Sequence, residues 1–95
     1  MNETIIESSG NVFTDLGFSS EEATLLKLRA DLMASLRETI EARGWTQAQA
    51  ATVLGIGQPR VSDLVRGKWD KFSLDMLMAL AVRAGMHPRL ALEAA

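Results

Sequence analysis

The chain has 95 residues, which is enough for one small domain and too few for two. Apolar residues make up 47% of the sequence and aromatic residues only 5%, and there is no cysteine, so we expect one aliphatic, mainly helical core and exclude disulfides and thiolate metal sites. No apolar run reaches membrane-spanning length and the N-terminus lacks the basic region of a signal peptide, so we expect a cytoplasmic protein that has no membrane partner.

The net charge of −2 argues mildly against a nucleic-acid partner, but the charges divide unevenly along the chain. Residues 1–42 carry eight acidic and three basic side chains, a net charge of −5, whereas residues 43–95 carry seven basic and four acidic ones, a net charge of +3. This asymmetry is typical of proteins with two binding faces. An ordinary solvated surface is the alternative interpretation, and the charges alone do not exclude it.

Residues 1–18 are expected to form a loosely ordered N-terminal arm. They are mostly polar, with isolated apolar pairs and glycines at positions 10 and 17. A short strand at residues 11–15 and an arm that becomes ordered only on a partner are both compatible with this pattern.

A long amphipathic helix is expected to follow and to end near Gly44, which can adopt the left-handed conformation that terminates helices. Ser19 and Glu22 form a capping box at its start. Apolar residues then recur at three- and four-residue spacing, which is the stripe of a helix that buries one face. The stripe consists of Leu25, Leu28, Leu32, Leu36 and Ile40.

Three shorter helices are predicted in the second half of the chain. The first begins at Thr46, which forms a capping box with Gln49, and ends near Leu54. The second spans about residues 58–66, and the third begins after the cap Ser73 and ends before Gly85. Residues 86–93 are compatible with either a short final helix or a strand.

The first two of these helices fit a helix-turn-helix unit on steric grounds. Two helices that cross steeply through a tight turn need a small residue at their closest approach, a residue of positive φ in the turn, and an apolar residue in the angle between them. Ala51, Gly55 and Val61 satisfy these needs in order. The remaining inward positions are apolar as well: Ala50, Leu54, Ile56 and Leu64. We therefore predict a helix-turn-helix unit at about residues 46–66, within a DNA-binding domain of residues 19–95.

The outward face of the second helix carries side chains that can hydrogen-bond to base edges or phosphates. These are Gln58, Arg60, Ser62 and Asp63, followed by the basic residues Arg66, Lys68 and Lys71. A helical hairpin with no role on DNA would require the same apolar pattern, but it would not require this outward face. The outward face therefore favours DNA binding. The basic residues that follow the helix are placed to meet the phosphate backbone.

The stretch T-Q-A-Q-A-A-T-V-L-G-I-G-Q-P-R-V-S-D-L-V-R-G-K, residues 46–68, resembles the XRE/Cro-type helix-turn-helix. The preceding S-G-N-V-F-T-D-L-G-F-S-S-E-E-A, residues 9–23, together with the long helix, resembles HigA-like antitoxins and their stand-alone relatives. The resemblance implies an all-α, lambda-repressor-like fold of four to five helices. Its helix-turn-helix part is specific for DNA binding, whereas its N-terminal part is shared with regulators that have no toxin partner.

The resemblance also implies roles for individual residues. Phosphate contacts would come from Gln47, Ser62 and Lys68, and base contacts would come from Gln58, Asp63 and Arg60. Whether Arg60 reaches a guanine or the backbone stays open. Three of these residues also have a purely structural interpretation. Ser62 could simply face solvent, Asp63 could pair with Arg66, and Gln47 could be only a helix-start residue.

Gly57 departs from the family pattern, which usually has Ser or Thr at this position. Glycine is an acceptable helix cap, so the fold is not in doubt, but a hydroxyl that could meet a phosphate is absent. Pro59, in the first turn of the helix, partly compensates because it makes that turn rigid.

These observations predict a nucleoid-associated repressor that binds a palindromic double-stranded operator as a homodimer. The expected function is that of the antitoxin in a HigBA-like toxin-antitoxin pair. The acidic first half of this chain would suit a basic toxin. The alternatives are a stand-alone XRE regulator and a protein-interaction module with a vestigial helix-turn-helix. His87 is the single histidine and no nucleophile stands beside a base, so we expect no enzyme activity, no metal and no cofactor.

Overall fold

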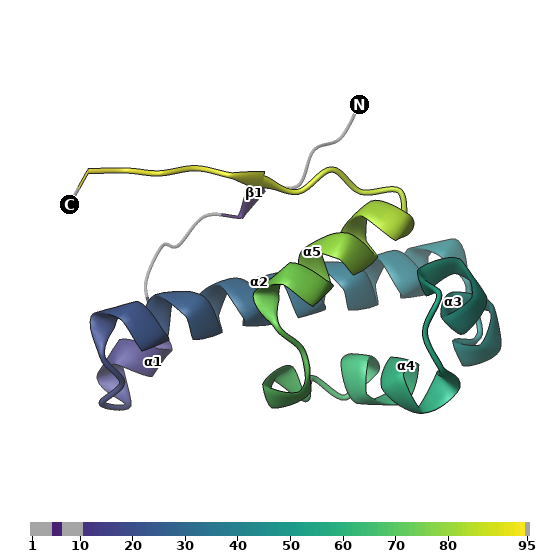
Figure 1. Ribbon diagram of the computed structural model, residues 1–95, viewed down its shortest axis with the longest axis horizontal. Helices are drawn as coiled ribbons and strands as arrows, with labels where there is room; N and C mark the ends of the chain where they lie inside the picture. The colour runs from purple at the N-terminus through teal and green to yellow at the C-terminus, as the bar shows by residue number, and fades with distance from the viewer. Residues whose placement is uncertain (1–4, 7–10, 95) are drawn as a thin grey trace.

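The computed structural model describes residues 5–6 and 11–94, and these form a helical domain with one minimal strand pair. Figure 1 shows the arrangement, in which the long helix α2 runs through the molecule and the shorter helices lie along it. The elements in chain order are β1 (Ile5–Ile6), α1 (Val12–Asp15), α2 (Ser20–Arg43), α3 (Gln47–Leu54), α4 (Gln58–Val65), the 3-10 turn η1 (Trp69–Lys71), α5 (Leu74–Arg83) and β2 (Arg89–Leu90). The all-α class of four to five helices is confirmed.

The strands β1 and β2 pair in parallel, with Ile5 opposite Arg89 and Ile6 opposite Leu90. This pair joins the start of the described chain to the segment that follows α5, and Figure 1 shows it above α2 and α5. Of the two conformations left open for residues 86–93, the strand is therefore the one found, at Arg89–Leu90.

The strand considered for residues 11–15 does not form, because Asn11 caps a short helix there. The Asn11 side chain accepts a hydrogen bond from the backbone N–H of Phe13 at 3.0 Å, and its amide donates to the carbonyl oxygen of Ala23 at 2.8 Å. Asparagine is among the best helix caps, and this one also ties α1 to α2. Residues 11–18 are thus packed onto the domain, while residues 1–4 and 7–10 of the expected arm lie outside the described residues.

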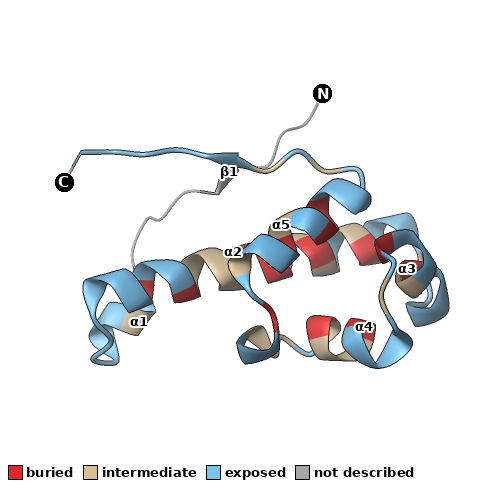
Figure 2. Ribbon diagram, in the orientation of Figure 1, coloured by how far each residue is buried: buried red, intermediate tan, exposed pale blue. Residues whose placement is uncertain are grey.

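The helix α2 begins and ends where the capping signals place it. Ser19 accepts from the backbone N–H of Glu22 at 3.2 Å, and Gly44 closes the helix with φ 67°. The predicted stripe is buried only in its second half, since Leu25 is 45% exposed whereas Leu32 and Leu36 are buried. Figure 2 shows the reason: the short helices α3, α4 and α5 cover the later part of α2, whereas its first turns pack against α1 and lie beside Trp69 of η1.

The core lies where α5 and the pair α3–α4 meet the second half of α2. Its largest fully buried side chains are Met33, Leu36, Leu54, Val61, Leu64, Leu77 and Leu80. Burying each such aliphatic side chain contributes about 1.5–3 kcal/mol to folding, so this cluster fixes α4 rigidly against the rest of the domain. Within the described part of the chain, no helix is long and apolar enough to cross a membrane.

Candidate nucleic-acid interface

The turn between α3 and α4 has the geometry that the sequence predicts. Gly55 adopts φ 68°, and its N–H and that of Ile56 both donate to the carbonyl oxygen of Ala51, at 2.8 and 3.1 Å. Val61 is completely buried in the angle between the two helices. The left-handed conformation at Gly55 thus turns the chain within a few residues and sets the direction of α4.

Arg83 of α5 reinforces this turn from outside the helix-turn-helix unit. Its Nη1 donates to the carbonyl oxygen of Leu54 at 2.9 Å, which satisfies a carbonyl at the C-terminus of α3. A Cβ at Gly55 would lie 3.5 Å from the same Nη1. Sequence reasoning missed Arg83 because it lies 29 residues from Leu54, and no local pattern links the two.

The N-terminus of α4 is open toward solvent. Gly57 occupies the cap position with φ −73° and ψ 156°, no side chain caps the helix, and Pro59 stands in the first turn. Gln58 and Arg60 are both exposed. The first turn of α4 therefore presents uncapped backbone N–H groups and two long polar side chains on the outside of the domain.

Arg60 is exposed but held in one orientation. Its guanidinium lies 4.7 Å from the ring centroid of Phe72, and Nη2 donates to the carbonyl oxygen of Lys71 at 3.4 Å. Phe72 is itself 2% exposed, so the platform under Arg60 is part of the core. An arginine held in this way loses less conformational entropy when it binds a partner. Sequence reasoning also missed this role of Phe72.

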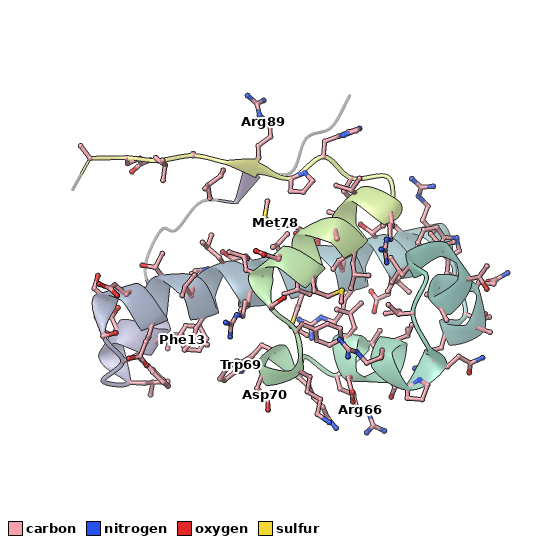
Figure 3. The ribbon with its side chains drawn as sticks, viewed as in Figure 1. Phe13, Arg66, Trp69, Asp70, Met78 and Arg89 are labelled. Carbon is pink, nitrogen blue, oxygen red and sulfur yellow. The ribbon has the colours of Figure 1, made fainter. Side chains whose placement is uncertain are left out.

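Asp63 pairs with two lysines rather than with Arg66. Its carboxylate oxygens lie 3.5 Å from Nζ of Lys68 and 3.9 Å from Nζ of Lys71. The Asp63 side chain is 19% exposed, against 41% and 52% for the lysines. Arg66 instead extends away from the domain (Figure 3). The structure thus joins α4 to the turn η1 through a small group of alternating charges.

The remaining predicted contacts are available for a partner. Gln47 is exposed at the first position of α3, and Ser62 is half-buried in the middle of α4. Among the described residues, the side chains of Gln47, Gln58 and Ser62 form no hydrogen bond. The structure thus brings Asp63 together with Lys68. It places Gln47 on α3, four of the other predicted contacts on α4, and Lys68 just before η1.

Trp69 packs on the domain. It lies in η1 with its ring centroid 6.4 Å from that of Phe13, in an edge-to-face arrangement, and it is packed against the core cluster. This contact joins α1 to the segment that follows α4, so the N-terminal region supports the position of Lys68 and Lys71.

The comparisons with known proteins agree with this geometry. The family model described as a helix-turn-helix domain matches residues 12–92. A solved structure named as an XRE-family transcriptional regulator is 30% identical to the chain, with a TM-score of 0.73, and the match covers 78% of this chain and 83% of that one. No curated protein matches the chain. The matched span, the identity and the geometry of α3 and α4 place this protein in the helix-turn-helix family, as a member of its XRE type.

Proposed function

We propose that this protein is a sequence-specific DNA-binding transcriptional repressor. The observation that carries the proposal is the division of α4 into two faces. Val61 and Leu64 are completely buried, whereas Gln58 and Arg60 are exposed on the same eight-residue helix. A helix fixed in this way on a rigid core, with polar side chains on its outer face, is suited to the major groove. Membership of the helix-turn-helix family supports DNA as the partner.

The outer face of α4 would read bases. Gln58 would pair with an adenine edge, and Asp63 would accept from a cytosine amino group after leaving its lysines. Arg60 would contact a guanine or the adjacent backbone from its platform on Phe72.

Three side chains would fix the protein on the DNA backbone. Gln47 stands at the start of α3, where the backbone N–H groups of a helix end attract phosphate. Ser62 and Lys68 would contact the phosphates next to the bases read by α4. These contacts set the register on the duplex and carry no sequence information of their own.

A homodimer on a palindromic operator is part of the proposal, because one short helix reads only a few base pairs. The two half-sites would lie about 34 Å apart or a multiple of that distance. The end of the described chain offers an exposed apolar surface for such a contact, since Leu90 is 60% exposed and Leu92 is 89% exposed next to the short strand β2. Exposed apolar side chains beside a strand edge are typical of contacts between copies of one chain.

An antitoxin role is the finer part of the proposal. The first half of the chain carries a net charge of −5, which suits a basic toxin, and residues 9–23 resemble HigA-like antitoxins. The protein would act without enzyme activity, metal or cofactor, on the nucleoid in the cytoplasm. A stand-alone XRE regulator is the second candidate, favoured by the 30% identical structure, which is named as a transcriptional regulator.

One genetic observation and one assay distinguish these candidates. A small basic open reading frame beside the gene, whose product stops growth unless this protein is co-expressed, supports the antitoxin. If no such open reading frame exists and the protein rescues growth from no candidate toxin, the stand-alone regulator remains. Gel-shift titration against the protein's own promoter tests both, and an absence of salt-sensitive binding at micromolar protein would leave only an interaction module with a vestigial helix-turn-helix.

A further inference from the structure

A small pocket lies at the opposite end of α2 from the helix-turn-helix turn. It measures about 240 Å³ and is lined by Phe18, Glu22, Leu25, Leu26, Arg29 and Trp69. Pockets for drug-sized ligands usually have about 300–1,000 Å³, so this one fits a smaller molecule. The proposed DNA contacts do not use any of these six residues.

The aromatic side of the pocket is already formed in the free protein. Phe13 contacts Phe18 edge to face with ring centroids 6.1 Å apart, and it contacts Trp69 in the same manner at 6.4 Å. Figure 3 shows Phe13 and Trp69 facing each other between α1 and η1. Leu25 completes the apolar lining and is 45% exposed, because α5 does not reach this part of α2. Binding of an apolar ligand would therefore carry little entropy cost for ordering these aromatic side chains.

Arg29 gives the pocket one unsatisfied positive group. Its Nε is buried and has no hydrogen-bond partner among the described residues. Glu22, the acidic residue of the same pocket, accepts a hydrogen bond from the Ser19 hydroxyl at 3.1 Å and forms no ion pair with Arg29. A buried donor without an acceptor is unfavourable, and a carboxylate is the group that a guanidinium binds best.

We propose that this pocket binds a small carboxylic acid with an aromatic or branched aliphatic tail. The carboxylate would lie on the Arg29 guanidinium and the tail against Trp69 and Leu25. Trp69 directly follows Lys68 and lies in η1, which connects α4 to α5, so a bound acid changes the support of the DNA-contacting residues. That regulatory consequence rests on the proposed function, whereas binding of the acid does not.

The two tryptophans allow a direct test by NMR with isotope-labelled protein. Trp69 lines the pocket, while Trp45 lies before α3 with the Arg43 guanidinium 5.7 Å from its ring centroid. Titration with phenylacetate and indole-3-acetate should shift the indole N–H signal of Trp69 saturably and leave that of Trp45 in place. We expect dissociation constants below about 1 mM for the acids and at least roughly tenfold weaker binding of phenylacetamide and indole-3-acetamide.

Two pairs of variants locate the interaction. Arg29→Gln should abolish the difference between acid and amide, whereas Arg43→Gln, at the other end of the same helix, should keep it. Leu25→Glu should weaken binding of the acids about tenfold or more through charge repulsion, whereas Leu16→Glu should not, because Leu16 is 68% exposed and does not line the pocket. Melting temperatures of all four variants show whether each is folded.

The proposal is overturned by any of three results. These are no saturable Trp69 shift up to about 10 mM acid, equal affinity for acid and amide in the wild-type protein, and unchanged selectivity in a folded Arg29→Gln variant. None of the three measurements involves DNA. Failure of the pocket and failure of the DNA-binding role are therefore distinguishable.

Discussion

At the scale of single residues, the ion pairs of Asp63 with Lys68 and Lys71 would influence how strongly the free protein attracts DNA. The lysine side chains are 41% and 52% exposed, and Asp63 lies within ion-pair distance of both, at 3.5 and 3.9 Å. Exposed ion pairs contribute only about 0–1 kcal/mol to stability, so the effect of this group on folding is small. Its effect on a polyanion is larger, because Asp63 lowers the positive potential that the lysines present to phosphates.

Replacing Asp63 by asparagine should strengthen non-specific DNA binding and steepen its dependence on salt. The slope of log K against log salt should grow by about 0.9 for each additional phosphate that the freed lysines neutralise. Specific binding should gain less, since Asp63 is also proposed to read a base. Asp31→Asn is the matched control, because Asp31 pairs with Lys27 on α2 at 2.8 Å, outside α4 and η1. Equal slopes for the wild-type protein and Asp63→Asn would disprove this role.

Replacing Arg60 by alanine should alter the preference of the protein at one base pair of its site by roughly 1–3 kcal/mol. The stacking on Phe72 and the hydrogen bond to the Lys71 carbonyl hold the guanidinium ready for a base edge. Competition binding against singly substituted sites measures this. Arg66→Ala is the control, since Arg66 extends outward and its loss should weaken all sites alike. A uniform loss in Arg60→Ala would instead make Arg60 a phosphate contact.

At the scale of elements, the helix-turn-helix unit was predictable from the sequence, but the contacts that other helices make with it were not. The small residue at Ala51, the positive φ at Gly55 and the apolar plug at Val61 are local requirements, so their spacing is visible in the sequence. The Arg83 hydrogen bond to Leu54 and the Phe72 platform under Arg60 join residues from different helices. No periodicity or spacing encodes such contacts.

The strand considered for residues 11–15 was wrong for a similar reason. A four-residue helix has no visible periodicity, so the cap at Asn11 was the one local signal, and the hydrogen bond from Asn11 to Ala23 adds a tertiary contact. The stripe on α2 was read correctly as helical, but its pattern does not say how far the other helices extend along it. Leu25 is therefore exposed in a pocket where a core position was expected.

Replacing Gly55 by alanine should destabilise the domain by about 1–2 kcal/mol, because a side chain at φ 68° is strained. The new Cβ would also lie 3.5 Å from the Arg83 guanidinium, which is an ordinary contact and adds little. Urea unfolding measures the change. Gly57→Ser is the control, since Gly57 has φ −73° and serine there should add a few tenths of a kcal/mol as a cap. A neutral Gly55→Ala variant would contradict the turn geometry.

At the scale of the whole molecule, the domain places its proposed functions at different ends of one long helix. The helix-turn-helix unit packs on the second half of α2, and the aromatic pocket lies at its first half. The end of the described chain carries the exposed Leu90 and Leu92 beside β2. In a chain of 95 residues, the proposed DNA binding, self-association and ligand site would thus each use a separate surface.

Replacing Leu90 and Leu92 together by glutamate should abolish the proposed dimer and leave the monomer folded, since both side chains are exposed. Binding to a palindromic site should then weaken at least about 100-fold, because the second half-site no longer gains effective concentration from the first. Analytical ultracentrifugation and gel shift measure the two effects. Val82→Glu is the control, as Val82 is 58% exposed on α5. An unchanged dimer would place the self-association surface elsewhere.

Selection of bound DNA from a random pool, at physiological salt, tests the DNA-binding claim most directly. The account predicts enrichment of an inverted repeat whose half-site centres lie about 34 Å apart or a multiple of that distance. It also predicts that a Gln58→Ala variant relaxes the preference at one position in each half-site. A pool that stays unenriched, with no salt-sensitive binding at micromolar protein, would contradict the assignment of α4 as a DNA-reading helix.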